Sequence, residues 1–227
     1  MRALLFSIMI MSLVLNQLSA QIKLNDVNCY NLGDGRYYCQ EIKSKKPLEG
    51  SVRLIDGVST QYIEAVYKKG IPDGSWKKFK YNVLVEECTY KDGILHGAYI
   101  EYYADGSKKL EQYFVNGKAE GKFLYYGSND KIEREVNYKD GQQDGADISY
   151  DRDGNIQSTT FYSAGKETGL KKQLYSDYEL TANYIDGKYD GDYSEIYTNG
   201  NVKVTGGRYI TRHTRYRNRS SIYTQQE

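Results

Sequence analysis

The feature that most constrains this chain is a pair of glycines, four residues apart, that recurs about every 24 residues. The second glycines of successive pairs are 23, 24, 24, 24 and 22 residues apart, and an aromatic residue stands three positions before each first glycine. Repetition at such a period is typical of an array of small units that pack against their neighbours. The pairs are Gly70/Gly74, Gly93/Gly97, Gly117/Gly121, Gly141/Gly145, Gly165/Gly169 and Gly187/Gly191, and the aromatic residues are Tyr67, Tyr90, Phe114, Tyr138, Tyr162 and Tyr184.

A second turn signal lies between the glycine pairs. Asn-Gly and Asp-Gly accept a positive φ at low cost and favour tight hairpin turns. The intervening segments are short, rich in residues that suit strands, and without helical periodicity. The sequence therefore predicts an all-β fold, an elongated single-layer antiparallel sheet of tandem β-hairpin repeats. The signals are Asp105-Gly106, Asn129-Asp130, Asp153-Gly154 and Asn199-Gly200.

Folding the chain about the first three of these signals as two-residue turns predicts the same cross-strand pair each time. A glycine weakens a strand because it has no side chain to pack, and an aromatic ring across from it covers the bare backbone. If both glycines were only loop residues, the recurrent aromatic would have no explanation. The predicted pairs, which we assign as structural repeat residues, are Gly97 with Phe114, Gly121 with Tyr138 and Gly145 with Tyr162.

Strand alternation places the residue two positions after each second glycine on the same face as the ring. That row is Trp76, Tyr99, Phe123, Asp147, Lys171 and Tyr193. Aromatic residues are enriched at binding hot spots, so its four aromatic members are candidate binding residues: Trp76, Tyr99, Phe123 and Tyr193. The competing interpretation is that these rings only pack against one another. The other face offers Tyr102, Tyr126 and Tyr150 as the next candidates.

The N-terminus predicts export. Arg2, an apolar run over residues 3–15 and the small pair Ser19-Ala20 have the layout of a secretory signal peptide, with an uncleaved N-terminal anchor as the alternative. A secreted, periplasmic or cell-envelope location follows. An oxidising compartment permits a Cys29–Cys39 disulfide across a hairpin-like segment, and Cys88 is interpreted as a small buried hydrophobe.

Four segments are predicted: a signal peptide (1–20), an N-terminal β cap (21–45), about seven hairpin repeats (46–207) and a basic C-terminal tail (208–227). The tail holds five arginines and one glutamate, and without Arg2 the chain has 30 basic and 30 acidic residues. Zero net charge argues against a nucleic-acid partner.

No pattern of catalytic or metal-binding residues is present. His96 and His213 have no cysteine or histidine at metal-ligand spacing, and no calcium-loop motif occurs. Glu86 and Glu87 alternate faces in a strand. We therefore expect no catalytic residue, no metal and no cofactor, and a protein that is not an enzyme.

The repeats resemble a known family. "YKDGILHGAYIEYYADGSKKLE" and "YIDGKYDGDYSEIYTNGNVKV" are similar to the MORN repeat variant, in particular to the bacterial antitoxin-type MORN proteins. The resemblance covers about residues 46–208 and departs from the pattern at Asp147 and Lys171, which replace aromatic residues. It implies a row of antiparallel hairpins that makes protein or membrane contacts, and the antitoxin name implies neutralisation of a partner toxin.

Repeat architecture and resemblance together predict an exported, non-catalytic scaffold that binds a protein partner, with antitoxin-like neutralisation as its specific form. The alternative is a binder of cell-surface polysaccharide or anionic lipid headgroups, because aromatic faces suit sugars and a basic tail suits anionic surfaces. A tail that is simply a solvated chain end is equally consistent with the sequence.

Overall fold

The computed structural model describes residues 20–57, 60–208 and 218–221, which divide into two compact units, one up to Gly97 and the other from Ala98 onwards. The predicted signal peptide before Ala20 and most of the basic tail, including His213, lie outside the described residues. Unit 1 contains β1 (Ala20–Lys23), the short 3-10 helix η1 (Leu24–Asp26), β2 (Val27–Asn31), β3 (Tyr37–Glu41), β4 (Gly50–Ile55), β5 (Gln61–Lys68), β6 (Ile71–Lys80), β7 (Val83–Lys91) and the start of β8 (Ile94–Tyr102).

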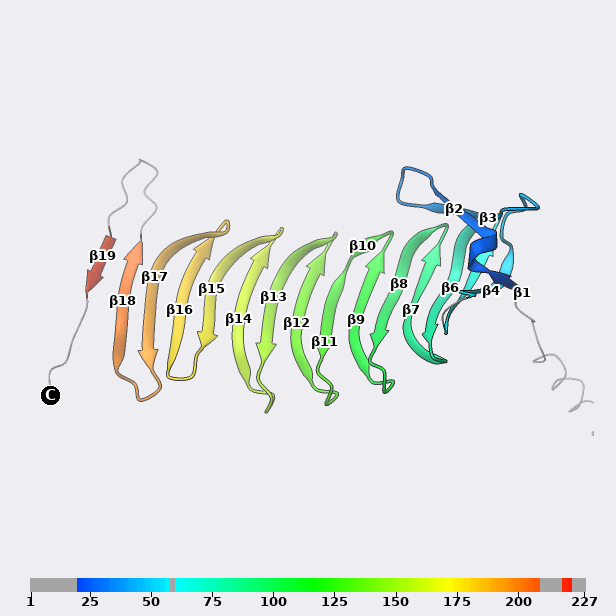
Figure 1. Ribbon diagram of the computed structural model, residues 1–227. Helices are drawn as coiled ribbons and strands as arrows, with labels where there is room; N and C mark the ends of the chain where they lie inside the picture. Colours follow the sequence, from blue (N-terminus) through cyan, green and yellow to red (C-terminus); the bar gives the residue numbers. More distant parts are fainter. Residues whose placement is uncertain (1–19, 58–59, 209–217, 222–227) are drawn as a thin grey trace, which may run out of the picture. The chain divides into compact units, whose positions relative to one another are not determined.

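Unit 2 continues from β8 as a series of hairpins (Figure 1). Its strands are β9 (Lys108–Val115), β10 (Lys118–Ala119), β11 (Gly121–Tyr126), β12 (Ile132–Lys139), β13 (Gln142–Tyr150), β14 (Ile156–Ser163), β15 (Lys166–Leu174), β16 (Tyr178–Ile185), β17 (Lys188–Tyr197), β18 (Val202–Arg208) and β19 (Asn218–Ser221). Strands that are neighbours in the chain pair antiparallel from β4 to β7 and from β11 to β19. The predicted all-β fold of tandem antiparallel hairpins is confirmed.

The first glycine of each pair closes a two-residue turn. In the β12–β13 hairpin, Lys139 pairs with Gln142, which leaves Asp140 (φ 51°) and Gly141 (φ 86°) as the turn. Two successive positive φ values define a type I′ turn, whose twist matches that of the flanking strands. All six first glycines and the residues before them share this conformation.

The Asp-Gly and Asn-Gly signals form three-residue loops, so the predicted two-residue turns were wrong. The Asp151 N–H donates to the Asn155 carbonyl (2.9 Å), and only Gly154 (φ 93°) of the central residues has a positive φ. This is a type I turn followed by a left-handed glycine, and it shifts the pairing by one residue between Ser149 and Tyr150. The Asp151 carboxylate favours this loop because it accepts the Asn155 N–H (2.9 Å).

The second glycine lies opposite the aromatic residue, at a bulge. Gly121 pairs with Tyr138 and Gly145 with Tyr162, while Gly97 and Phe114 belong to different units. Gly145 has φ 109°, and a Cβ there would lie 3.1 Å from the Cβ of Asn137 on β12. The bulge therefore requires glycine for its backbone conformation and for the close approach of the neighbouring strand.

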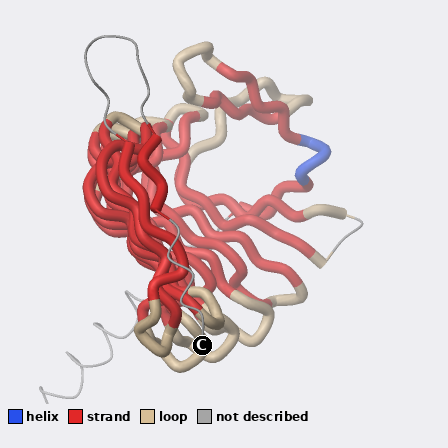
Figure 2. Tube along the Cα trace, turned by 90° about the vertical axis from the view of Figure 1, so that its left-hand side faces the viewer, coloured by secondary structure: helices blue, strands red, loops and turns tan. Residues whose placement is uncertain are grey.

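An N-terminal cap covers one face of the sheet in unit 1 (Figure 2). The β2–β3 hairpin is joined by a Cys29–Cys39 disulfide, with an S–S distance of 2.05 Å. The Cys39 N–H donates to the Gly70 carbonyl (2.7 Å), and the Gly70 N–H donates to the Leu48 carbonyl (2.8 Å). The cap thereby completes a buried core of Cys39, Leu48, Val52, Leu54, Ala65 and Tyr67.

Buried hydrophobic residues in unit 2 are dispersed along its strands. Phe123, Val136 and Ala182 are each under 5 % exposed, although the described part of unit 2 contains no second layer over the sheet. Neighbouring side chains on the same face must therefore cover them. No helix among the described residues has the length and apolar character needed to cross a membrane.

Candidate binding surfaces of the sheet

Each unit has two distinguishable sheet faces. We call the one that carries the aromatic residue paired with the second glycine the glycine face, and the other the opposite face. Cross-strand partners share a face. Because Val136 pairs with both Phe123 and Asp147, these three residues lie together on the glycine face of unit 2.

The four candidate binding residues have different surroundings. Trp76 is half-buried against the core that the cap completes in unit 1. Phe123 is only 4 % exposed, so its ring packs within the protein. Tyr99 and Tyr193 are half-buried on the glycine face of unit 2. The structure does not bring the four together in one site.

An aromatic ladder crosses the N-terminal part of unit 2. The Tyr99 ring meets Phe114 edge-on at 6.3 Å between ring centroids, Phe114 lies 5.6 Å from Phe123, and Phe123 lies 4.3 Å from Tyr138. Such tilted and edge-to-face contacts add to the stabilisation from burial. Phe123 therefore acts in packing, which is the competing interpretation given for the row.

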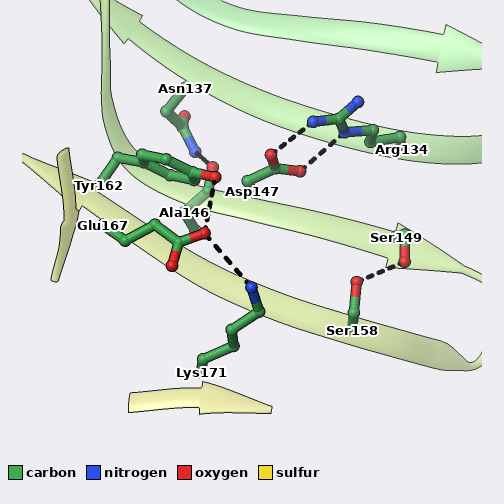
Figure 3. Close-up of polar contacts among 9 residues, drawn as sticks. All are labelled: Arg134, Asn137, Ala146, Asp147, Ser149, Ser158, Tyr162, Glu167 and Lys171. Carbon is green, nitrogen blue, oxygen red and sulfur yellow. Dashed lines mark hydrogen bonds and ion pairs between the residues drawn. The ribbon is translucent and has the colours of Figure 1, made fainter. Parts of the chain in front are cut away.

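Charged pairs replace the aromatic ladder further along the glycine face (Figure 3). Asp147 receives two hydrogen bonds from Arg134, Nε to Oδ1 at 2.9 Å and Nη2 to Oδ2 at 2.6 Å. The hydrogen bonds to Asp147 raise the pKa of Arg134 above its usual value. A bidentate pair of this kind is both strong and directional. Asp147, which breaks the aromatic pattern, thus has its own partner on β12.

The next repeat is held by a second polar group. Lys171 Nζ lies 3.3 Å from Glu167 Oε1, and the Tyr162 hydroxyl donates to the same oxygen at 3.4 Å. The Lys171 ammonium also lies 5.5 Å from the centre of the Tyr184 ring. Ser149 and Ser158 share a hydrogen bond of 2.6 Å between their hydroxyls (Figure 3). The four charged side chains in these contacts, Arg134, Asp147, Lys171 and Glu167, pair within the face.

A tyrosine-rich cluster lies on the glycine face of β16–β18. The Tyr193 hydroxyl donates to Glu195, whose carboxylate lies 3.2 Å from Lys203 Nζ. The hydrogen bond to Glu195 and burial raise the pKa of Tyr193 to about 12. Lys203 Nζ lies 3.5 Å from the centre of the Tyr178 ring, and this contact is a cation–π interaction. The same tyrosine–glutamate–lysine arrangement occurs at Tyr99, Glu101 and Lys109, where Glu101 accepts a hydrogen bond from Tyr99 and pairs with Lys109.

The opposite face of unit 2 changes character along the chain. Its early strands carry paired charges, with Glu111 2.7 Å from Lys108 and Glu135 2.6 Å from Lys122. The later strands carry hydroxyls instead, at Thr159, Thr181, Ser194 and Thr205. Among these hydroxyls, four apolar side chains are 40–41 % exposed: Phe161, Leu170, Leu174 and Ile196. We call these eight residues the hydroxyl–apolar surface.

The apolar members of this surface form two pairs of neighbours in the sheet. Leu174 and Ile196 both pair with Glu179, from its two sides. A Cβ at Gly169 would lie 3.9 Å from the Cβ of Phe161, which places Phe161 beside the start of the strand segment that carries Leu170. Apolar side chains that are exposed next to one another on a sheet face are candidates for an interaction site.

Side chains suited to chemistry are few in the described part of the chain. No group of three or more histidine, cysteine or acidic residues there could hold a metal ion. Burial raises the pKa of the Cys88 thiol to about 12, which makes it a poor nucleophile at neutral pH.

Comparison with known proteins gives a family match for two adjacent repeats. A model of the MORN repeat variant matches residues 95–116 and 119–140. Among solved structures, one entitled "Crystal structure of GtfA/B complex" is 17 % identical, with a TM-score of 0.21, over 52 % of this chain. This chain spans 20 % of that one, and so low a TM-score does not establish a shared fold. Comparison with curated proteins found no match.

Sequence reasoning did not find the hydroxyl–apolar surface or the Arg134–Asp147 pair. The signal for the surface was present as a change from glutamate to threonine at equivalent positions, namely Glu64, Glu87, Glu111 and Glu135 followed by Thr159, Thr181 and Thr205. The signal for the pair was the cross-strand register of β12 with β13, which places Arg134 diagonally from Asp147.

Proposed function

We propose that this protein is an exported, non-catalytic repeat scaffold that binds a protein partner through the hydroxyl–apolar surface of unit 2. The match to the MORN repeat variant supports a repeat-protein binding scaffold. The observation that carries the choice of surface is the group of four apolar side chains, each 40–41 % exposed, on β14, β15 and β17. Removing these four apolar side chains from water by contact with a partner would be favourable in free energy.

Exposure favours this surface over the glycine face. Phe123 is buried and Trp76 packs against the core of unit 1, so the glycine face offers Tyr99 and Tyr193 as its remaining candidates. Its described ion pairs Arg134–Asp147, Lys171–Glu167 and Lys203–Glu195 each join one cation to one anion, so they add no net charge that would attract anionic lipid headgroups. Neutralisation of a toxin is the specific role that the antitoxin-type resemblance implies, and co-expression with candidate toxins would test that role directly.

Site-specific photo-crosslinking tests the surface. A photoreactive phenylalanine analogue at Leu174 should capture a specific partner in the native host, and the same analogue at Tyr193 should not. The double variant Phe161→Gln/Leu174→Gln should lose the partner, whereas Val115→Gln/Ile185→Gln, which changes exposed apolar residues elsewhere in unit 2, should retain it. Crosslinks only from Tyr193 would assign the site to the glycine face, and their absence at both positions would reject the scaffold role.

A further inference from the structure

A hollow of about 390 Å³ lies on the opposite face of unit 2, at the C-terminal end of the hydroxyl–apolar surface. Strands β15 to β18 all contribute to it, and Figure 1 shows these strands side by side. The side chains that line it on this face are Leu170, Thr181, Asn183, Asp192, Ser194 and Thr205.

A glycine in β18 leaves this face bare beside Asp192. Asp192 pairs with Gly207, and cross-strand partners share a face. At the equivalent position of the preceding repeat the chain carries a side chain, Asn183 in β16. Because Gly207 has none, no side chain of β18 lies directly across from Asp192.

The hollow has polar groups without partners. In the described part of the chain, Asp192, Asn183 and Thr205 make no side-chain hydrogen bond or ion pair. Other carboxylates on this face are paired, as Glu179 is with Lys172 at 3.9 Å. Thr181 and Ser194 bond to each other (2.6 Å) and still have oxygen lone pairs to offer. None of the described side chains that line the hollow is cationic, so these side chains present acceptors and one negative charge, that of Asp192.

We propose that this hollow receives an arginine side chain of the protein partner. A guanidinium carries five N–H donors in a plane and no acceptor, which suits a carboxylate, hydroxyls and an amide oxygen spread over three strands. Its methylene stem would pack on Leu170, which is 41 % exposed. A lysine ammonium is a single point of charge and reaches fewer of these acceptors, and an anion is repelled by Asp192.

The proposal rests on the proposed protein-binding function, but its test needs no partner. The probe is Nα-acetyl-L-arginine amide, titrated into the full exported chain at low salt and followed by amide chemical shifts. We expect saturable shifts confined to the strand segments around the hollow, with a Kd of roughly 1–20 mM for so small a ligand. Asp192→Asn should weaken binding about tenfold, because a charge-assisted pair becomes a neutral contact.

Matched controls separate a built site from general charge attraction. Asp186→Asn removes an exposed carboxylate on the β16–β17 turn, outside the hollow, and should leave binding unchanged. The citrulline and lysine analogues of the probe should each bind at least about fivefold more weakly than the arginine probe. Equal binding of either analogue, equal effects of the two substitutions, or no saturable shift up to about 50 mM would overturn the proposal. Because partner capture is measured separately, failure of the scaffold role would leave the result of the titration intact.

Discussion

At the residue scale, side chains in unit 2 are covered by neighbours on adjacent strands. Val136, 1 % exposed, lies between Phe123 and Asp147, its partners on the two flanking strands. The Arg134–Asp147 pair is part of the cover over Val136. Its two side chains differ in exposure, because Asp147 is 11 % exposed and Arg134 is 47 % exposed. The two partners therefore depend on each other to different extents.

This asymmetry predicts unequal costs for removing either partner. Arg134→Ala leaves a buried carboxylate without its counter-charge and should cost about 3 kcal/mol. Asp147→Ala leaves a half-exposed guanidinium that water can solvate, and should cost about 1 kcal/mol. Urea unfolding measures both free energies. Lys118→Ala, which breaks an exposed pair with Asp140, is the control and should change stability by less than about 0.5 kcal/mol. Equal losses for the first two variants would contradict this account.

Burial of Cys88 makes a separate prediction about reactivity. The side chain is 5 % exposed and its pKa is raised to about 12 by desolvation, so the thiol stays protonated at pH 8. A raised pKa favours the protonated form in the folded state, and that stabilisation is lost as pH rises from about 9 towards 12. At pH 8, iodoacetamide should leave native Cys88 unmodified and alkylate it in urea, as mass spectrometry would show. Alkylation of the folded chain at the unfolded rate would refute the prediction.

At the element scale, each hairpin is joined to the next through its type I′ turn. The Asp140 N–H donates to Glu120 of the preceding repeat (3.0 Å), and the Gly141 N–H donates to the Ala119 carbonyl (2.9 Å). Asp144 accepts the Ala164 N–H in the same way (3.1 Å). A carboxylate just before the second glycine thus satisfies a donor that the turn itself leaves open.

Removing that carboxylate should loosen one junction between repeats. We expect Glu120→Ala to cost about 1 kcal/mol and to speed hydrogen exchange at the Asp140 amide, while amides in distant repeats keep their rates. Glu120→Gln keeps an acceptor oxygen at the same place and should recover most of the protection. If the alanine and glutamine variants exchange alike at Asp140, the side-chain hydrogen bond is not what holds the junction.

The elements show which features local sequence could predict. The pairing of Gly121 with Tyr138 was predicted by counting from a two-residue turn, and it holds because a one-residue shift between Tyr125 and Tyr126 offsets the extra residue of the actual loop. The turn type was not predictable in this way, because Asp153-Gly154 suits both a two-residue turn and a type I loop with a bulge. Contacts such as Glu120 with the Asp140 amide join residues 20 positions apart and need the register of two strands at once.

The candidate site was less accessible to sequence reasoning for a related reason. Pattern alone placed Phe123 on a face, but its burial depends on ring contacts from Phe114 and Tyr138, on two other strands. The hydroxyl–apolar surface likewise becomes visible only when exposed fractions on several strands are compared. Position in the repeat therefore indicated which face a side chain takes, and packing decided whether it can meet a partner.

At the scale of the whole molecule, the two units differ in how they bury apolar side chains. Unit 1 has a contiguous core under the cap, formed by six buried residues with Ile22, Val27, Ile63 and Trp76 packed against it. In unit 2 the buried hydrophobic residues are dispersed along the sheet. Repeat arrays gain stability from each interface between neighbours, so regions with different packing can unfold separately.

This difference predicts that unit 1 outlasts unit 2 in denaturant. Trp76 is the only tryptophan of the chain and packs against the core of unit 1, so its fluorescence reports on that unit, whereas far-UV circular dichroism reports on all strands. The urea midpoint from fluorescence should lie above that from circular dichroism. Leu48 is 2 % exposed, and Leu48→Ala opens a cavity in the core of unit 1. The free energy of unfolding measured by fluorescence should therefore fall by about 2–4 kcal/mol. Val136→Ala, the matching change in unit 2, should lower the urea midpoint measured by circular dichroism and leave the midpoint measured by fluorescence unchanged. Coincident transitions in the unmodified protein and in both variants would instead mean that the chain unfolds as a single cooperative body.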